Sequence, residues 1–171
     1  CEEIKKKGII GIEQQPGMYT LACANMLLKG DGKANIYAED CFTMVNEIKK
    51  RHKCTVAMLN PPYSQKGENL QELDFVMNAL EMLEKGGRCV AVVPMSCAIG
   101  KDDIKRQILN KHTLKAVMSL PNDLFYPVGV VPCIMLFEAH TPHDPNIETW
   151  FGYWKDDGFI KTKHQGRIDS G

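Results

Sequence analysis

Apolar and polar positions follow two different periods along this chain. Short apolar runs bounded by polar or turn residues predict strands, and they lie at residues 8–13, 34–38, 54–59 and 88–94. Between them, apolar residues recur at helical spacing over residues 16–29, 44–51, 70–85 and 102–110. Strands that alternate with amphipathic helices are typical of an α/β fold, in which helices cover both faces of a parallel sheet.

The ends of these segments carry start and stop signals. Pro16 stands at the start of the first predicted helix, and Gly30 follows its end. The helix predicted over residues 70–85 ends at Gly86-Gly87. Its apolar face consists of Leu73, Val76, Met77, Leu80 and Leu83. That face is most simply explained as core packing.

The last third of the chain adds three predicted strands. Residues 114–120 and 132–139 are joined by a loop rich in Pro, Asn, Asp and Gly, and residues 149–154 form an edge strand. Residues 155–171 are left as a polar tail. A chain of 171 residues suits one domain with a proper core.

Composition narrows the class of protein. The chain has 21 basic and 21 acidic residues, which argues against a surface that is basic throughout but leaves room for local patches. Its seven cysteines are scattered with no C-x-x-C pair, so we expect reduced thiols and no metal site. Because no apolar run reaches membrane-spanning length and the start lacks the features of a signal peptide, we expect a cytoplasmic protein.

Polar residues follow three of the predicted strands. Glu13 ends the first strand, Asp40 follows the second and Asn60 follows the third. Ligands of a parallel sheet bind beyond the carboxyl ends of its strands, so these residues are candidates for binding. Taken singly, Glu13 and Asp40 also fit acids in solvated loops, and Asn-Pro-Pro also fits a plain turn.

The run Asn60-Pro61-Pro62-Tyr63 also fits a specific chemistry. The exocyclic amine of adenine is a poor nucleophile because its lone pair is delocalised into the ring. Two hydrogen-bond acceptors that hold its N–H groups favour a pyramidal nitrogen. Two such acceptors are available here, the Asn60 side-chain oxygen and the Pro61 carbonyl oxygen. The two prolines stiffen that carbonyl, and the Tyr63 ring can stack on a base that has left the duplex.

These four residues resemble the catalytic motif of the amino-directed, S-adenosylmethionine-dependent methyltransferases. The segments IEQQPGMYTLACANMLLKGDGKANIYAEDCF and SLPNDLFYPVGVVPCIMLFEAHTP resemble the modification subunit of type I restriction systems. The resemblance implies a Rossmann-like methyltransferase sheet flanked by helices, S-adenosylmethionine as cofactor, and methylation of adenine amines in DNA. It also implies two protein partners, a specificity subunit that reads the DNA and a restriction nuclease subunit.

For the cofactor, the resemblance assigns roles to four residues. Glu13 matches the acid that binds the ribose hydroxyls, in agreement with its place at a strand end. Asp40 matches the acid near the amine of the cofactor's adenine, and Cys41 and Phe42 would line that adenine ring.

For the target base, the resemblance assigns the motif itself. Asn60 and Pro61 match the acceptors for the amine, and Tyr63 matches the stacking ring. The loop with Phe125 and Tyr126 lies at the target-base side in the family, and the resemblance gives it no specific role.

One feature of the family pattern is missing. Its glycine-rich cofactor loop, D-P-x-x-G-S-G, should precede the strand at residues 8–13, where only CEEIKKK stands. We therefore expect residues 1–171 to be the C-terminal part of a catalytic domain, with a sheet incomplete at its first strand. Such a sheet has two unpaired apolar edges, which predicts negligible cofactor binding by this chain alone and a tendency to self-associate.

Two alternatives stay open from the sequence. The same acceptors suit a methyltransferase that acts on a protein glutamine amide or an RNA base, since those amines need the same activation. The missing loop also fits an inactive interaction fragment that keeps the fold. The segments SLPNDLFYPVGVVPCIM and WFGYWKDDGF favour DNA over the other substrates.

Overall fold

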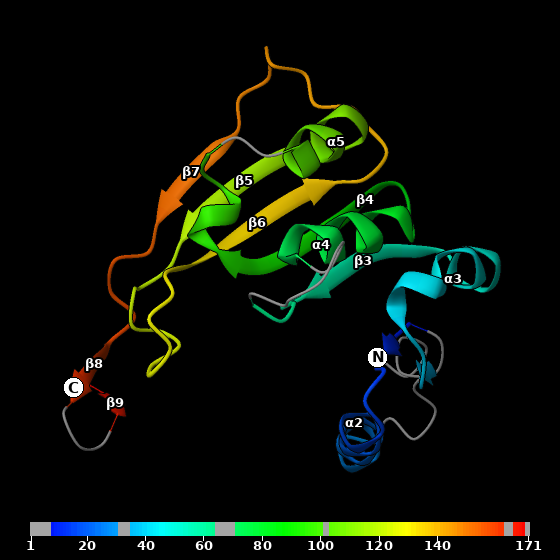
Figure 1. The fold of residues 1–171 in the computed structure, drawn as a ribbon, viewed down its shortest axis with the longest axis horizontal. Helices are drawn as coiled ribbons and strands as arrows, with labels where there is room; N and C mark the ends of the chain where they lie inside the picture. Colours follow the sequence, from blue (N-terminus) through cyan, green and yellow to red (C-terminus); the bar gives the residue numbers. More distant parts are fainter. Residues whose placement is uncertain (1–7, 31–34, 64–70, 101–102, 163–165, 170–171) are drawn as a thin grey trace. The chain divides into compact units, whose positions relative to one another are not determined.

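A computed structural model describes residues 8–30, 35–63, 71–100, 103–162 and 166–169. Contacts divide the chain into two units, Cys1–Ile48 and Lys49–Gly171, and each is described by itself below. Figure 1 colours the elements along the chain, with the first unit in blue and cyan. None of the described helices is both long and apolar enough to cross a lipid bilayer.

The first unit is built on two short parallel strands. Strand β1 (Ile10–Ile12) pairs with β2 (Asn35–Tyr37), and the ladder extends to Glu13, whose N–H donates to the Tyr37 carbonyl at 3.0 Å. A 3₁₀ turn, η1 (Cys41–Thr43), and helix α3 (Val45–Arg51) follow. The strands predicted at residues 8–13 and 34–38 are therefore confirmed, each with shorter ends.

Helix α2 (Pro16–Leu28) connects the two strands, and its ends are those that the sequence predicts. Pro16 has no backbone N–H, so it leaves no unpaired donor in the first turn of the helix. Gly30 has φ of +79°, and its N–H donates to the Leu27 carbonyl at 3.0 Å, so it provides the left-handed end of the helix. No residue of α2 is buried, and Leu28 is 84% exposed.

The second unit contains a five-stranded sheet with the order β3-β4-β6-β5-β7. The strands are β3 (Cys54–Leu59), β4 (Leu83–Pro94), β5 (Thr113–Ser119), β6 (Pro132–Glu138) and β7 (Trp150–Tyr153). Strand β3 is parallel to β4 and β7 is parallel to β5, whereas β6 is antiparallel to both of its neighbours.

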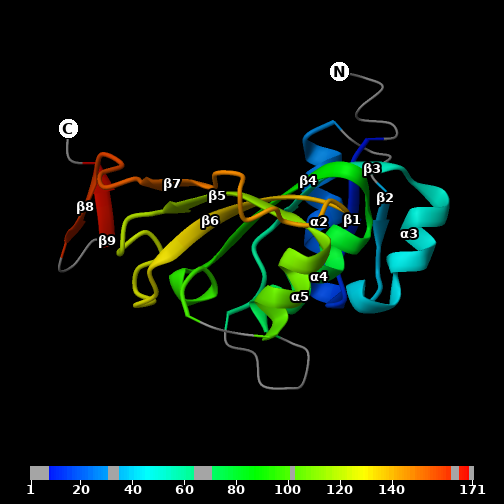
Figure 2. The ribbon, with the colours of Figure 1, turned by 90° about the horizontal axis from the view of Figure 1, so that it is seen from above.

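The mixed sheet corrects the prediction of a parallel one, while the α/β class holds. Strands β5 and β6 are joined by a loop without a crossover helix, and two strands joined in this way pair antiparallel. Within this unit, helices α4 (Glu72–Glu81) and α5 (Asp103–Lys111) lie on the same face of the sheet (Figure 2). The prediction of helices on both faces is therefore not met by the described helices of this unit.

The core of the second unit lies between α4, α5 and the sheet. Its fully buried side chains include Val76 and Leu80 on α4, Ile108 on α5, and Phe137 on β6. The alternation of buried and less buried residues along β6 matches the period of a strand with one covered face.

Helix α4 ends earlier than its apolar pattern predicts. The helix stops at Glu81, and Leu83, counted among its apolar face, begins β4 instead. Gly86 has φ of +78° within a register shift of β4 against β3, and a Cβ on Gly87 would lie 2.9 Å from the Glu84 carbonyl oxygen. The two glycines thus lie in a β-bulge. A bulge, like the end of a helix, can require a positive φ, which glycine adopts without strain.

Prolines mark one end of the central ladder. Pro94 of β4 pairs with Pro132 of β6, and the 3₁₀ turn η2 (Met95–Cys97) follows directly. At the outer edge of the sheet, Val56 and Met58 of β3 are 61% and 80% exposed. No described strand pairs with that edge of β3.

The segment expected to be a polar tail contains an antiparallel hairpin. It consists of β8 (Phe159–Thr162) and β9 (Gly166–Asp169), with Phe159 opposite Asp169. Gly158, just before β8, has φ of +80°, and its N–H donates to the Asp156 carboxylate at 2.9 Å. The turn chemistry of Asp-Asp-Gly therefore starts a strand in this segment.

Candidate active site

The topology of the second unit brings several chain segments to one edge of the sheet. Strands β3 and β4 are parallel, so the residues after Leu59 and after Pro94 leave the sheet at the same edge. Because β6 is antiparallel, the loop at residues 120–131 between β5 and β6 lies at this edge as well. The edge therefore combines Asn60-Pro61-Pro62-Tyr63, η2 and this loop.

The four motif residues differ in exposure. Asn60 is exposed directly after β3, Pro61 is buried, Pro62 is exposed, and Tyr63 is half-buried. A buried proline with fixed φ anchors the backbone beside an accessible amide. This arrangement leaves the Asn60 side chain open to a ligand while holding the Pro61 backbone in place.

Tyr63 points into the unit and contacts the loop. Its ring meets that of Phe125 edge to face, with centroids 6.2 Å apart and an interplanar angle of 67°. Burial raises the pKa of the Tyr63 hydroxyl, with smaller contributions from Cys133, Cys97 and Glu72. The hydroxyl oxygen is buried and has no hydrogen-bond partner among the described residues.

A small cleft lies at the start of α4. It has a volume of about 170 Å³. Its lining consists of Gln71, Glu72, Leu73, Ser96, Cys97 and Ile104, which belong to the start of α4, to η2 and to α5. None of the four motif residues lines the cleft.

Consecutive turns shape the loop at residues 120–131. The N–H groups of Leu124, Tyr126 and Val128 donate to carbonyls three residues earlier, at 3.2, 3.0 and 2.8 Å. At its base, the Leu120 N–H donates to the Pro132 carbonyl and the Met95 N–H to the Val131 carbonyl. The loop is therefore tied to η2 and to β6, and Phe125 lies in its middle.

The contact between Phe125 and Tyr63 was not predicted from the sequence. The sequence placed Phe125 in a loop at the target-base side but gave no partner for it. One signal in the sequence could have indicated it. Two consecutive apolar strands joined by a loop pair antiparallel, and this pairing places residues 120–131 at the end of the sheet where β3 also ends.

In the first unit, the two predicted acids lie at one edge of the β1–β2 pair. Glu13 follows β1, and its Oε1 accepts the Gln15 N–H at 2.7 Å. Asp40 lies three residues after β2, and its Oδ1 accepts the Phe42 N–H at 2.9 Å at the start of η1. Because the strands are parallel, both carboxylates stand at the carboxyl edge of the pair.

This set of groups fits part of a nucleoside. One oxygen of each carboxylate accepts the backbone N–H just described, and the second oxygen can accept from a hydroxyl or an amine. Phe42 and Cys41 are half-buried in η1, next to Asp40, and offer an aromatic and a soft apolar surface. The geometry thus groups Asp40, Cys41 and Phe42 in one turn, with Glu13 at the same edge of the sheet.

The thiols show no sign of metal or disulfide chemistry in the described part of the chain. Its six cysteines are free, as expected from their spacing. Burial raises the pKa of Cys89 to about 12 and that of Cys133 to about 11, which keeps both thiols protonated and unreactive. Among these residues, no group of three His, Cys, Asp or Glu side chains is placed to hold a metal ion.

Comparison with known proteins gives a consistent result. A family model described as N-6 DNA Methylase matches residues 1–167. The type II restriction enzyme and methyltransferase RM.BcgI of Heyndrickxia coagulans is 41% identical over 177 residues, which cover 99% of this chain and 28% of that protein. The type I restriction enzyme EcoKI methylase subunit of Escherichia coli is 30% identical over 158 residues, which cover 82% of this chain and 30% of that subunit.

Solved structures support the fold. The crystal structure of the EcoKI M protein aligns with a TM-score of 0.66 at 26% identity, covering 82% of this chain and 33% of that one. A type I restriction-modification methyltransferase subunit from Streptococcus thermophilus aligns with a TM-score of 0.66 at 18% identity, covering 77% of this chain and 34% of that one. The predicted methyltransferase fold is confirmed, and the chain spans less than a third of the length of these curated relatives.

Proposed function

Because this chain belongs to the N-6 DNA methylase family, we propose that it carries part of the active site of a DNA methyltransferase acting on the exocyclic amine of adenine. The observation that carries the proposal is the sheet edge at which Asn60-Pro61-Pro62-Tyr63 follows β3 and meets Phe125. The edge offers an exposed amide, a stiff carbonyl and two aromatic rings, which are the groups that an extracted adenine needs.

Asn60 and Pro61 activate the target amine in this proposal. The Asn60 side-chain oxygen and the Pro61 carbonyl oxygen accept the two N–H groups, which favours a pyramidal nitrogen with an available lone pair. The Pro61 carbonyl is set before the reaction, since Pro61 is buried and its φ is fixed, whereas the exposed Asn60 side chain is held only by its place directly after β3. These two oxygens would hold the amine through its N–H groups, and the proton that the methylated nitrogen loses would leave to solvent, since amide oxygens are too weakly basic to keep it.

Tyr63 and Phe125 hold the base. Their edge-to-face contact forms an aromatic corner, and a purine leaving the duplex can stack on such a surface. The Tyr63 hydroxyl has no hydrogen-bond partner among the described residues, which supports a role for the ring rather than for the hydroxyl.

Glu13, Asp40, Cys41 and Phe42 hold S-adenosylmethionine, which supplies the activated methyl group when bound. Glu13 binds the ribose hydroxyls, Asp40 accepts from the adenine amine, and Cys41 and Phe42 line the adenine ring. The place of both acids at one carboxyl edge of parallel strands supports these roles. The negligible cofactor binding expected of the 171-residue chain alone stays a prediction.

The family also suggests the setting of the reaction. We propose a restriction-modification system, with a specificity subunit that reads the DNA and a nuclease subunit as partners, and with the cytoplasm as the place of action. Free thiols suit a reducing compartment. Self-association through the exposed edge of β3 remains a prediction.

The test uses the protein expressed from its complete gene together with its DNA-reading partner. Transfer of a labelled methyl group to duplex DNA is measured, and the product nucleoside is identified by chromatography as N6-methyladenine. Asn60→Ala should lower the rate by about 10²–10³, as removal of one preset stabiliser does in other enzymes, while cofactor binding persists.

Asn110→Ala is the matched control, because Asn110 is an exposed asparagine on α5, outside the motif. If the labelled methyl group appeared in RNA or protein and not in DNA, the result would support the alternative substrates. Full turnover by Asn60→Ala would refute the role of Asn60.

A further inference from the structure

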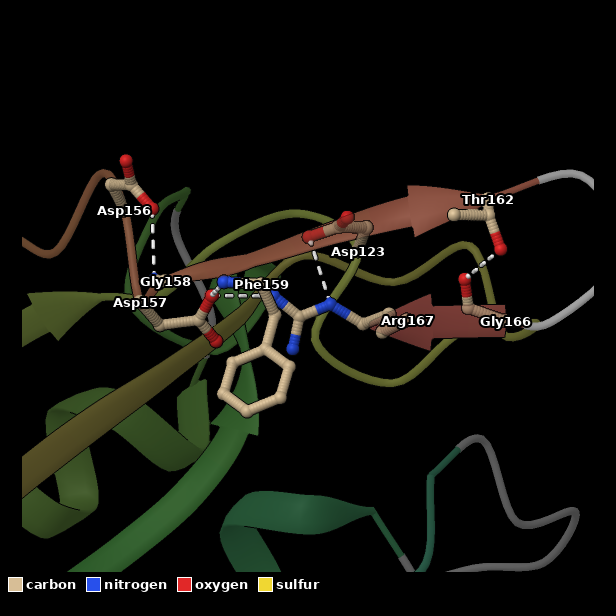
Figure 3. Close-up of polar contacts among 8 residues, drawn as sticks. All are labelled: Asp123, Asp156, Asp157, Gly158, Phe159, Thr162, Gly166 and Arg167. Carbon is tan, nitrogen blue, oxygen red and sulfur yellow. Dashed lines mark hydrogen bonds and ion pairs between the residues drawn. The ribbon is translucent and has the colours of Figure 1, made fainter. Parts of the chain in front are cut away.

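A separate set of contacts ties the β8–β9 hairpin to the loop that carries Phe125 (Figure 3). Arg167 of β9 donates from Nη2 to Asp157 Oδ1 at 2.6 Å, just before β8. Its Nε lies 3.5 Å from Oδ1 of Asp123, which belongs to the loop at residues 120–131. The guanidinium carbon also lies 5.6 Å from the centroid of the Phe159 ring.

The guanidinium group of Arg167 is enclosed. Its side chain is 14% exposed, whereas Arg106 and Asp103 on α5, which form an ordinary surface pair, are 71% and 91% exposed. The hydrogen bond from Arg167 lowers the pKa of Asp157, so that carboxylate stays charged. A planar guanidinium can face two carboxylates in two directions at once, here with a hydrogen bond to Asp157 and an ion pair to Asp123, which an ammonium group does less well.

A second contact joins the same two segments. Lys161 of β8 places its Nζ 4.4 Å from the centroid of the Tyr126 ring, which is within the range of a cation–π interaction. Asp123 and Tyr126 lie on either side of Phe125 in the sequence. The hairpin therefore holds the loop at two points, and the ring that meets Tyr63 lies between them.

We propose that Arg167 is a positioning residue for the target base, which fixes the loop so that Phe125 stays against Tyr63. This inference rests on the proposed function. Arg167 does not touch the reacting atoms; it acts through Asp123 and the turns of the loop. Small displacements of groups that orient a substrate lower the rate strongly, so a loosened loop should be visible in catalysis.

The experiment uses the protein expressed from its complete gene, its DNA-reading partner, and duplex DNA with 2-aminopurine at the target adenine. Emission of 2-aminopurine rises when the base leaves the stack, and it reports positioning independently of methyl transfer. Arg167→Gln should lower both the emission change and kcat on unmodified DNA, the latter roughly tenfold. The KM for S-adenosylmethionine should stay the same.

Two further variants separate positioning from folding. Arg167→Lys keeps the charge but loses the planar fork, and it should recover part of the activity. Asp123→Asn removes the partner on the loop, and it should reproduce the effect of Arg167→Gln, with no further loss in the double variant. Arg106→Gln is the matched control and should behave like the wild type.

The outcomes distinguish this inference from the function on which it rests. A wild type that methylates no DNA adenine overturns the proposed function. A wild type that does so, with normal kcat and 2-aminopurine emission in both Arg167→Gln and Asp123→Asn, overturns the positioning role alone. If Arg167→Gln lowers the melting temperature too far for assay, Asp123→Asn and Arg167→Lys decide the question by the same two readouts.

Discussion

The two units of this chain differ in how much they bury. In Lys49–Gly171, α4 and α5 cover a five-stranded sheet, and side chains such as Phe137, Val76 and Leu80 are almost completely enclosed. In Cys1–Ile48, no residue of β1, α2 or β2 is buried, and the buried side chains among the described residues are Met44 and Ile48. The residues proposed to accept the target amine thus stand on the well-packed unit, and the acids proposed for the cofactor stand on the unit with fewer buried side chains. We expect a defect in the second unit to change stability and a defect in the first to change binding.

The largest effect should come from the core of the second unit. Phe137 on β6 is 2% exposed, so Phe137→Ala should lower the free energy of unfolding by about 3–5 kcal/mol. Leu28→Ala at the exposed end of α2 should change it by no more than about 0.5 kcal/mol. Urea denaturation followed by circular dichroism measures both. Equal losses in the two variants would contradict the contrast between the units.

The next effect concerns pH, and it also lies in the second unit, which holds all five histidines of the chain. His112 is fully buried, and its Nδ1 accepts the His140 N–H at 3.0 Å. Its Nε2 has no hydrogen-bond partner among the described residues and lies 3.9 Å from Glu81 Oε1, while Glu81 accepts from Lys111 at 2.9 Å. Burial, followed by the nearby His140, lowers the pKa of His112 from 6.5 to about 4.

Because the unfolded chain binds this proton more readily, the stability contributed by neutral His112 is complete above pH 6.5. This contribution to the free energy of unfolding is lost as the pH falls toward 4, and the total loss is about 3 kcal/mol. His112→Asn keeps an acceptor near the His140 N–H and removes the titration. Denaturation midpoints between pH 7 and 4 should therefore fall less steeply in the variant, and equal slopes would contradict this assignment.

A smaller effect is expected at the aromatic corner. Tyr63→Ala should weaken methylation of duplex DNA by about 1–3 kcal/mol of stacking, whereas Tyr63→Phe should retain most of it. The reason is that the Tyr63 hydroxyl has no hydrogen-bond partner among the described residues, so its removal breaks no such bond. Kinetics of the two variants side by side provide the test. Similar losses for Ala and Phe would assign a role to the hydroxyl instead.

The smallest effect should come from the first unit. Glu13→Gln keeps the shape of the side chain but loses one charge-assisted hydrogen bond, so affinity for S-adenosylmethionine should fall by about 1 kcal/mol, or roughly fivefold. Titration calorimetry of the protein expressed from its complete gene measures this change, with the exposed neighbour Glu39→Gln as control. The KM for DNA should not change, and a selective change in it would contradict the division of roles between the units.

The sequence predicted the elements whose ends carry unambiguous signals. Strand β3 spans the predicted residues 54–59, because a polar turn precedes it and two prolines follow it. Helix α4 was predicted too long, because Leu83 fits a helical face as well as a strand and Gly86-Gly87 fits a bulge as well as a helix end. Local patterns do not distinguish these cases, since the choice is made by pairing with β3 and β6.

The candidate site likewise contains residues that local patterns predict and contacts that they do not predict. Asn60 and Glu13 are predicted as site residues because the end of an apolar run marks the end of a strand, and their roles stay predictions. The contacts of Phe125 with Tyr63 and of Arg167 with Asp123 were not found, because they join segments far apart in the sequence. They depend on the reversal of β6, which decides where the loop and the hairpin lie.

The pairing of Pro94 with Pro132 has a consequence for the backbone at the site edge. Pro61, Pro62, Pro94 and Pro132 all stand where strands leave or enter the sheet, and none has an amide hydrogen. These four positions offer no backbone N–H to any acceptor, and they contribute no signal in amide hydrogen exchange. At these prolines the ends of the strands carry a carbonyl without the N–H that normally accompanies it, which is the condition that the proposed role of the Pro61 carbonyl requires.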